Sequence, residues 1–315
     1  MIEVEGLTKY YGPYPAIRDV TFRVEEGDVV AFLGPNGAGK TTTMRILTSF
    51  TAPTTGKASI AGFDVWDDPM NSRRHIGYLP ETSPLYTDLT VRQHLKYGAR
   101  LCRYPEDKVD ERVDRVMDLC NLSDRADTLI HKLSKGYRQR VGLGMAIVHD
   151  PPVVILDEPT IGLDPKQVVE TRRLIRELGK EHTVMLSTHI LPEAQSIAQR
   201  VIIINEGSII AEDTPDNLTA QIRRARSLRV RVKDTSPSVA GKLRDLAGVS
   251  GVRRTGEGGD GACYEVEMPV DGRDMRAEVA AFIVGNNWGL LEMTPIEMTL
   301  EDVFLRLTTE EEGAA

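Results

Sequence analysis

Two kinds of hydrophobic pattern alternate along the chain. Short, continuously apolar runs are typical of strands buried on both faces of a parallel sheet, and they occur at residues 28–33, 153–156, 183–186 and 200–204. From Thr90 to Asn121 the apolar residues recur at helical intervals instead. Thr90 is the expected N-cap of a helix over residues 91–101, and a second helix is expected over residues 108–120. The pattern predicts an α/β fold with a mostly parallel sheet and a helical insert at about residues 85–150.

Less regular patterns surround this sheet. Residues 2–5 and 16–24 alternate as two strands should, with a turn over residues 10–15 between them. Residues 55–62 fit a hairpin strand, and residues 74–79 fit a further buried strand.

Composition changes after residues 213–215, and a second region begins there. Its pattern has the order βαββαβ, which is the order of ferredoxin-like domains. The expected strands cover residues 228–232, 251–254, 262–268 and 290–294, the expected helices cover 238–246 and 273–284, and a loop is expected over 256–261. We therefore predict a nucleotide-binding α/β domain over residues 1–221 and a small α+β accessory domain over residues 222–315, with a last helix at 300–307.

The composition is that of a globular protein without a strong attraction to nucleic acid. Its 315 residues suffice for two domains. Asp and Glu number 47 against 39 Lys and Arg, whereas binding to a phosphate backbone needs a basic face. The apolar runs are shorter than the ~18–20 residues of a membrane span, and no signal segment follows Met1. We expect a cytoplasmic protein with no membrane span and no nucleic-acid partner.

The most specific motif is the glycine-rich stretch after the strand at residues 28–33. It fits the phosphate-loop pattern G-x-x-x-x-G-K-[ST] and consists of Gly34, Pro35, Asn36, Gly37, Ala38, Gly39, Lys40, Thr41 and Thr42. Its glycines let backbone N–H groups converge on an anion at a helix N-terminus. Lys40 then reaches the terminal phosphates, and Thr41 ligates Mg²⁺. The regular strand and helix on either side favour this interpretation over an ordinary turn, but they leave kinases, GTPases and ATPases open.

Two carboxylates end the apolar strand at residues 153–156. Asp157 stands where other phosphate-loop proteins hold Mg²⁺. Glu158 is one residue further, so it points elsewhere and can polarise an attacking water. Adjacent acids are common on protein surfaces but uncommon at the end of a wholly apolar strand, which favours a functional role here.

Two weaker signals lie on either side of that strand in the sequence. Ser134 and Gly136 open an expected helix over residues 138–147, whose free N–H groups and dipole face an anion. His189 ends the apolar strand at 183–186 and is placed beside the γ-phosphate. Taken alone, Ser134 is an ordinary N-cap, and a single histidine at a strand end is usually structural.

Together these elements resemble the ATP-binding cassette (ABC) family over about residues 1–215, in the family's order and spacing. Residues 133–137, LSKGY, are similar to the family's signature. The resemblance assigns roles to Tyr11 (adenine stacking), Ser134 and Gly136 (signature), Asp157 (Mg²⁺), Glu158 (catalysis), Asp164 (dimer-contacting loop) and His189 (switch).

Two positions depart from the family pattern. Glu81, in the run IGYLPE, stands where the family has its lid glutamine. A carboxylate there can still ligate Mg²⁺ or its water, although it adds negative charge near the phosphates. Tyr137 replaces the last residue of the signature. IGYLPE, LSKGY and residues 300–305 are similar to the ATPase subunits of ABC-2 type exporters, among them gliding-motility, copper-processing and drug-resistance proteins.

The resemblance implies an ATPase that binds ATP and Mg²⁺ and drives transport. One chain holds one phosphate loop and one signature, which in the family face different nucleotides, so two copies are expected to pack head to tail. Transport then requires separate transmembrane permease subunits, which are expected to dock around residues 83–95. The protein is expected to lie on the cytoplasmic face of the cell membrane.

Two other classes of function are less favoured. A soluble ABC ATPase acting on nucleic acid or ribosomes usually carries two cassettes, coiled coils or zinc modules, and the sequence shows none of these. Its only support is the basic run at residues 223–231, which also fits a solvated linker and strand face or a contact with anionic lipid. A small-molecule kinase is disfavoured by His189 and the signature helix.

Overall fold

The structure is a computed structural model that describes residues 1–222, 226–236, 238–258, 261–268 and 275–296. It divides the chain into two compact units, Met1–Pro215 and Asp216–Ala315. The division falls at the start of α8 (Pro215–Ile222), whereas the sequence placed the boundary at the end of that helix. No helix of the described ranges is long and apolar enough to cross a membrane.

A six-stranded sheet organises the first unit, in the order β10-β9-β3-β8-β7-β6. Its strands are β3 (Val29–Leu33), β6 (Ile76–Leu79), β7 (Val153–Asp157), β8 (Thr183–Thr188), β9 (Arg200–Asn205) and β10 (Ser208–Asp213). All neighbouring strands are parallel except β9 and β10. Every residue of β3, β7 and β8 is buried, because strands in the middle of such a sheet are covered on both faces. The predicted parallel strands are confirmed.

A second sheet, entirely antiparallel, has the order β2-β1-β4-β5. Its strands are β1 (Ile2–Tyr11), β2 (Tyr14–Val24), β4 (Thr55–Ile60) and β5 (Phe63–Asp64). The turn predicted over residues 10–15 is wrong in extent, because Tyr11 pairs with Tyr14 and only two residues lie between the strands. Register shifts along β1 interrupt its alternation, which is why the sequence pattern indicated a shorter strand.

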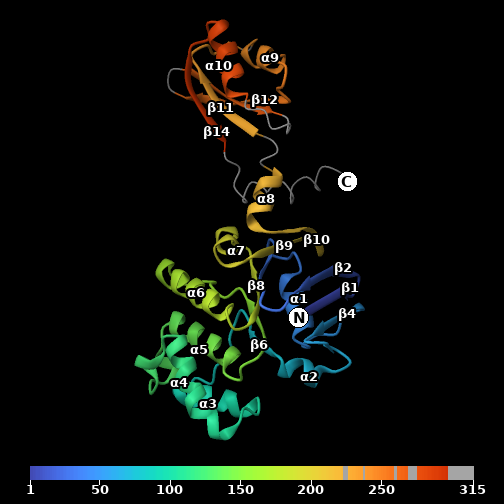
Figure 1. The fold of residues 1–315 in the computed structure, drawn as a ribbon, viewed down its shortest axis with the longest axis vertical. Helices are drawn as coiled ribbons and strands as arrows, with labels where there is room; N and C mark the ends of the chain where they lie inside the picture. The colour runs from blue at the N-terminus through green and yellow to red at the C-terminus, as the bar shows by residue number, and fades with distance from the viewer. Residues whose placement is uncertain (223–225, 237, 259–260, 269–274, 297–315) are drawn as a thin grey trace. The chain divides into compact units, whose positions relative to one another are not determined.

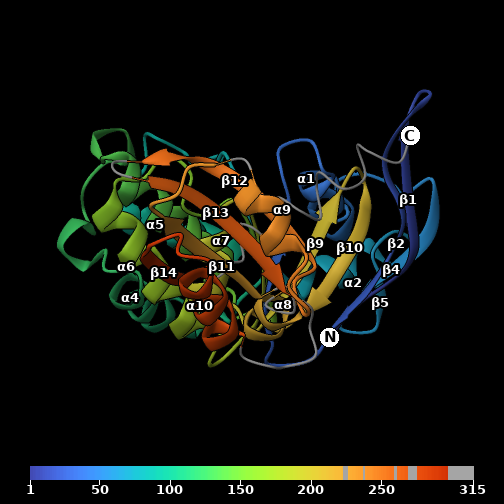
Figure 2. The ribbon, with the colours of Figure 1, turned by 90° about the horizontal axis from the view of Figure 1, so that it is seen from above.

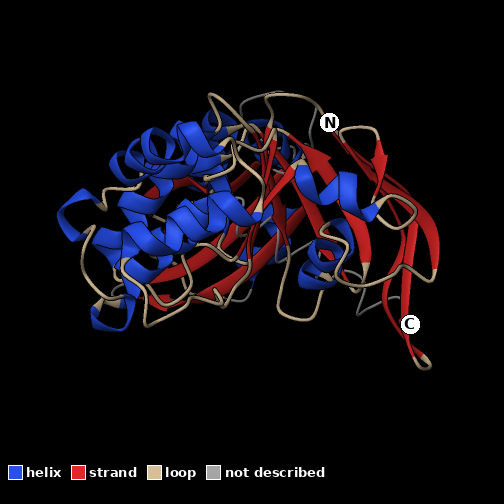
Figure 3. Ribbon diagram, turned by 90° about the horizontal axis from the view of Figure 1, so that it is seen from below, coloured by secondary structure: helices blue, strands red, loops and turns tan. Residues whose placement is uncertain are grey.

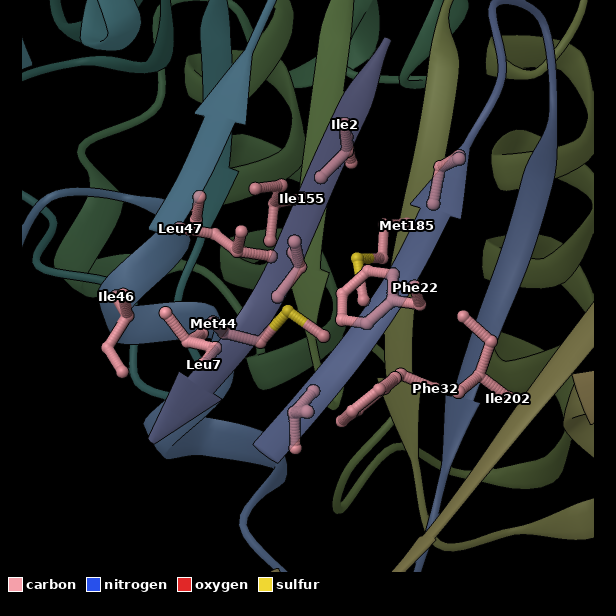
Figure 4. Packing of buried hydrophobic residues seen from close by; sticks show 14 of the residues in the cluster. Ile2, Leu7, Phe22, Phe32, Met44, Ile46, Leu47, Ile155, Met185 and Ile202 are labelled. Carbon is pink, nitrogen blue, oxygen red and sulfur yellow. The ribbon is translucent and has the colours of Figure 1, made fainter. Parts of the chain in front are cut away.

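The main core of the first unit fills the space between the two sheets. Ile2, Leu7 and Phe22 of the antiparallel sheet pack with Phe32, Ile155, Met185 and Ile202 of the parallel sheet, as Figure 4 shows. Helix α1 (Lys40–Leu47) contributes Met44, Ile46 and Leu47 to the same cluster. The phosphate loop precedes α1, so this core fixes both of its ends.

The helical insert contains α3 (Val91–Leu101), α4 (Val109–Leu119) and α5 (Lys135–Ile147), with short 3₁₀ turns at Glu106–Lys108, Ser123–Arg125 and Ile130–Lys132. These helices gather on the side of the unit away from β1, β2 and β4 (Figure 1, Figure 3). Thr90 caps α3 as predicted, and its capping box with Gln93 satisfies two backbone N–H groups. The remaining helices of the unit are α2 (Pro69–Arg74), α6 (Pro165–Leu178) and α7 (Leu191–Ile197).

The second unit contains α8 and a four-stranded antiparallel sheet in the order β12-β13-β11-β14. Its elements follow one another as β11 (Arg226–Val232), α9 (Ser238–Arg244), β12 (Gly251–Gly258), β13 (Gly261–Met268), α10 (Arg276–Gly285) and β14 (Leu290–Ile296). Helices α9 and α10 lie over the sheet (Figure 2). They share a core with it that contains Val230, Leu243, Tyr264 and Ile283. The loop expected over residues 256–261 is shorter, because β12 and β13 pair as far as Gly258 and Gly261. The helix expected at 300–307 lies outside the described residues.

Candidate active site

The phosphate loop connects β3 to α1 at the carboxyl edge of the parallel sheet. Its first N–H group, from Gly34, donates to the carbonyl of Thr188 on the neighbouring strand at 3.2 Å. Gly39 caps α1 at φ 108°, and a Cβ there would stand 2.7 Å from the carbonyl oxygen of Ala16. Only glycine fits both the conformation and the space, which explains the glycine immediately before Lys40.

Lys40 is folded back over the loop, with only 5% of its surface exposed. Its Nζ donates to the carbonyl oxygens of Gly34 at 2.8 Å and Pro35 at 3.1 Å. It also lies 3.4 Å from Oε1 of the buried Glu158. The cation is therefore held inside the cleft rather than in solvent.

Asp157, the last residue of β7, is hydrogen-bonded to Ser187 of β8 and to Thr41 of α1. Its Oδ1 accepts a hydrogen bond from Ser187 Oγ at 2.5 Å and a long one from Thr41 Oγ1 at 3.5 Å. Burial raises the pKa of Asp157, while these two hydrogen bonds act in the opposite direction. Thr41 and Asp157, the two predicted Mg²⁺ ligands, thus lie next to one another.

Glu158 adopts a left-handed backbone conformation with φ 49°, which costs about 1–3 kcal/mol in a non-glycine residue. Its N–H donates to Ser187 Oγ at 3.0 Å, which helps to hold this conformation. The turn directs its side chain away from that of Asp157 and toward His189, whose Nδ1 lies 2.9 Å from Glu158 Oε2. Glu158 is therefore a buried carboxylate between a lysine and a histidine.

Lys40, Thr41, Glu158 and His189 line a cleft of about 500 Å³, whereas Asp157 lines an adjoining groove. The lining of the cleft consists of Ala16, Asn36, Gly37, Gly39, Lys40, Thr41, Thr42, Glu81, Glu158, Ile161 and His189. The three predicted catalytic residues, Lys40, Glu158 and His189, thus meet in one place with Glu81, the residue that departs from the family pattern. Tyr11 is not part of this lining; it ends β1 with 48% of its surface exposed and has Lys9 Nζ 5.3 Å from its ring centroid.

Three other predicted residues form a separate cluster at the starts of α5 and α6. Ser134 caps α5 by accepting from the N–H of Tyr137 at 3.4 Å, and Asp164 caps α6 by accepting from the N–H of Gln167 at 3.0 Å. A Cβ on Gly136 would stand 2.3 Å from the side chain of Gln167. The signature and the loop that contains Asp164 are therefore packed together, and neither lines the cleft of the same molecule.

A wider groove of about 640 Å³ adjoins the cleft at Thr41 and Glu81, which line both. Phe50, Tyr78 and Met145 contribute apolar surface to it, and 76% of the Phe50 surface is exposed. Burial raises the pKa of Tyr78 to about 12, so this tyrosine keeps its proton. The groove runs between the parallel-sheet region and the helical insert.

Ser187 was not predicted as a site residue. Its hydroxyl connects the two acidic residues, because it donates to Asp157 Oδ1 and accepts from the N–H of Glu158. Ser187 and Thr188 are polar residues at the end of an otherwise apolar strand, and that position was the available signal. The structure brings them beside the site because β7 and β8 pair in parallel and end at the same edge.

The donor atoms present suit Mg²⁺. Thr41 and Asp157 offer oxygen ligands, which this hard cation prefers. Among the described residues no group of three or more His, Cys, Asp or Glu side chains can hold a metal ion.

The phosphate loop, Glu158 and a histidine line one cleft, and Asp157 is hydrogen-bonded to Thr41 of that loop. This arrangement defines a phosphate-loop nucleoside triphosphatase. The ABC transporter family model matches residues 17–161. The chain is also 31% identical to the bacitracin transport ATP-binding protein BcrA of Bacillus licheniformis, over 98% of this chain and 97% of that protein. The chain belongs to the family of ABC transporter ATP-binding proteins.

Solved structures agree with this assignment. The ATP-binding subunit of an ABC transporter is 34% identical with a TM-score of 0.65, over 70% of this chain and 93% of that chain. The cassette MJ0796, in a dimeric post-hydrolysis state bound to ADP and Pi, is 25% identical with a TM-score of 0.62, over 68% of this chain and 98% of that chain. The predictions of an ABC ATPase and of a transporter's ATP-binding subunit are confirmed, and a nucleic-acid or ribosome ATPase is not favoured.

Proposed function

We propose that the residues from Gly34 to Thr42 hold the phosphates of ATP and that Lys40 neutralises their terminal charge. Thr41 and Asp157 would hold Mg²⁺, with Glu81 as a further ligand to the ion or its water. When bound, the ion supplies positive charge at the phosphates. The position of the Lys40 cation within the cleft supports the proposal that it neutralises the terminal phosphate charge. Tyr11, at the end of β1, is proposed to stack on adenine.

Glu158 is the proposed catalytic carboxylate, and the observation that carries this assignment is its contact with both Lys40 and His189. A carboxylate between these two groups can accept a proton from water or orient it, while His189 fixes the direction of the side chain. Asp157 is directed elsewhere by Ser187 and Thr41, so the adjacent acids have different tasks.

We propose that two copies pack head to tail. Ser134, Gly136 and Asp164 lie outside the cleft of their own chain, so a second copy is needed to bring a signature to each nucleotide. A two-fold interface provides both contacts at once, and the related cassette MJ0796 is a dimer.

The protein partners of the chain are proposed to be the separate transmembrane subunits of an ABC-2 type exporter. Their docking surface is the groove beside Glu81, which includes Ser83, Leu85 and His94 of the segment 83–95. Its apolar lining and exposed Phe50 fit a protein partner, and the shared residue Glu81 connects docking to the metal site. The chain would then lie on the cytoplasmic face of the cell membrane, and no nucleic-acid partner is proposed.

The second unit is proposed to be a ferredoxin-like accessory domain that folds independently of the cassette. Its element order and the strand order β12-β13-β11-β14 support this assignment. Its core contains residues of its own strands and helices.

Glu158→Gln tests the catalytic assignment. The amide keeps the shape of the carboxylate but cannot accept the proton, so ATP turnover should fall by roughly 10²–10⁴-fold. ATP should still bind, and the variant should accumulate as an ATP-dependent dimer in size-exclusion chromatography. Glu177→Gln, an exposed glutamate on α6, is the control. A monomeric Glu158→Gln protein with normal turnover would rule out Glu158 as the catalytic group.

A further inference from the structure

Glu193, in α7, is a wholly buried carboxylate that the mechanism above does not use. Its exposed surface is 0%. Oε2 accepts a hydrogen bond from Thr188 Oγ1 at 2.6 Å. Oε1 has no hydrogen-bond partner, and the nearest cation is Arg172 Nε at 4.0 Å. Burying a carboxylate is unfavourable unless a cation and hydrogen bonds compensate it, so this residue is an unusual one to find in a core.

Thr188, the partner of Glu193, is bonded on three sides. Its hydroxyl donates to Glu193 and accepts from the N–H of Ile190 at 3.0 Å. Its backbone carbonyl accepts from the N–H of Gly34 in the phosphate loop at 3.2 Å. Thr188 is 0% exposed, so water does not replace these contacts.

His189 lies between Thr188 and Ile190, the two residues that the hydrogen bond from the Ile190 N–H to the Thr188 hydroxyl connects. The bond from Ile190 back to Thr188 closes the chain around His189 into a tight turn, and Glu193 fixes the rotamer of Thr188 that makes the turn. The turn presents His189 Nδ1 to Glu158, at 2.9 Å from Oε2. The His189 side chain is 35% exposed, so the turn and the contact with Glu158 help to fix the direction of its ring.

We infer that Glu193 and Thr188 are positioning residues that hold the switch histidine against Glu158, with Arg172 of α6 balancing the buried charge. Thr188 also connects this turn to the phosphate loop, because its carbonyl accepts from the N–H of Gly34. This inference rests on the catalytic roles proposed above for Glu158 and His189. It assigns a function to a carboxylate that touches neither cleft nor solvent.

Thr188→Val is the test, because valine keeps the shape of threonine and removes only the hydroxyl. In steady-state ATP hydrolysis by the full chain, kcat should fall roughly ten- to hundredfold, as expected for a misplaced catalytic group, with KM for ATP nearly unchanged. Thr188→Ser restores the hydroxyl and should restore kcat. Thr183→Val is the matched control: Thr183 begins the same strand, is 1% exposed and accepts a hydrogen bond from the N–H of Gly27. The control should keep its kcat.

A double-mutant cycle with His189→Ala separates positioning from general structure. If Thr188 acts through His189, adding Thr188→Val to His189→Ala should slow hydrolysis no further. The same slowing in both backgrounds, or an unchanged kcat in the single variant, would overturn the inference. Wild-type kcat in His189→Ala alone would instead overturn the proposed role of His189. If Thr188→Val does not fold, Glu193→Met provides a second cycle, because methionine removes the hydrogen-bond acceptor at similar volume. Glu193→Met should lower kcat in the wild-type background and not in His189→Ala. An equal loss of kcat in both backgrounds would overturn the inference.

Discussion

At the scale of single residues, the site is a balance of buried charges. Glu158 is in contact with Lys40 and His189, and Asp157 is in contact with Ser187 and Thr41. Buried charges need ion-pair or hydrogen-bond partners. Each of these side chains therefore stabilises the charge of its neighbour. A substitution that removes one charge should therefore affect one step of the ATPase reaction, such as ATP binding or hydrolysis.

Lys40→Ala should remove ATP binding while leaving the fold intact. The lysine donates to the carbonyls of Gly34 and Pro35 and pairs with Glu158, which keeps its contact with His189 in the variant. Its cation is the charge that is expected to reach the phosphates. We expect the dissociation constant for ATP to rise at least ~100-fold, equal to about 2.7 kcal/mol, in isothermal titration calorimetry. Lys57→Ala, an exposed lysine of β4, should bind as the wild type does. Unchanged affinity in Lys40→Ala would contradict the phosphate-loop assignment.

Glu81→Gln should change how the ATPase depends on Mg²⁺. Glu81 is exposed and lines both the cleft and the groove, so the amide keeps the shape and removes a charge from both. The variant should still hydrolyse ATP, with a shifted Mg²⁺ dependence and weaker stimulation by the membrane partner in liposomes. Glu111→Gln, on the exposed face of α4, is the control. Identical Mg²⁺ curves for wild type and Glu81→Gln would make Glu81 a neutral replacement for glutamine.

At the scale of elements, the ends of helices and strands place the functional groups. Thr90, Ser134 and Asp164 each cap a helix with a side-chain oxygen, and two of these three caps belong to the cluster proposed to meet the second copy. Parallel pairing of β7 with β8 brings Asp157 beside Ser187. Each of these three caps accepts a hydrogen bond from its helix, and only Ser134 and Asp164 are proposed to contact the second copy as well.

Thr90→Ala should separate those two roles. It removes the oxygen that accepts from the N–H of Gln93 at 3.2 Å, and loss of such a cap costs about 1 kcal/mol. Urea unfolding should show this loss of stability, while ATP affinity stays unchanged because α3 does not line the cleft. Thr90→Ser keeps the oxygen and should match the wild type. Weakened ATP binding in Thr90→Ala would show that the insert and the cleft are coupled in the monomer.

At the scale of the whole molecule, two units with separate cores share one chain. All predicted site residues belong to Met1–Pro215, and none belongs to Asp216–Ala315. The second unit's core is formed by its own strands and by α9 and α10. Of the described residues, those that line the cleft belong to the first unit.

A chain that ends after Ile222 should therefore fold and bind ATP with the affinity of the full chain. It retains the whole first unit and α8, so no strand of the first unit loses a partner. Circular dichroism and calorimetric titration with ATP check this outcome. An insoluble fragment, or one that does not bind nucleotide, would show that the two units depend on a common core.

Local patterns in the sequence were enough to predict most elements, and they supplied the residues proposed for the site. The continuous apolar runs predicted β3, β7, β8 and β9, since a central parallel strand is buried on both faces. The phosphate loop and the cap at Thr90 were predictable because their chemistry lies within a few consecutive residues. The strands β1 and β2 were predicted too short, because bulges in their pairing break the alternation that the sequence shows.

Contacts between distant segments were decided only by the tertiary structure. Ser187 lies 30 positions after Asp157, and only the pairing of β7 with β8 makes it the link between two carboxylates. The left-handed turn at Glu158 and the buried bond from Thr188 to Glu193 likewise have no local signature. The sequence determined which chemical groups the site contains, because short motifs encode loops and caps locally. The fold alone decided which of them touch, because hydrogen bonds across a sheet depend on register and burial.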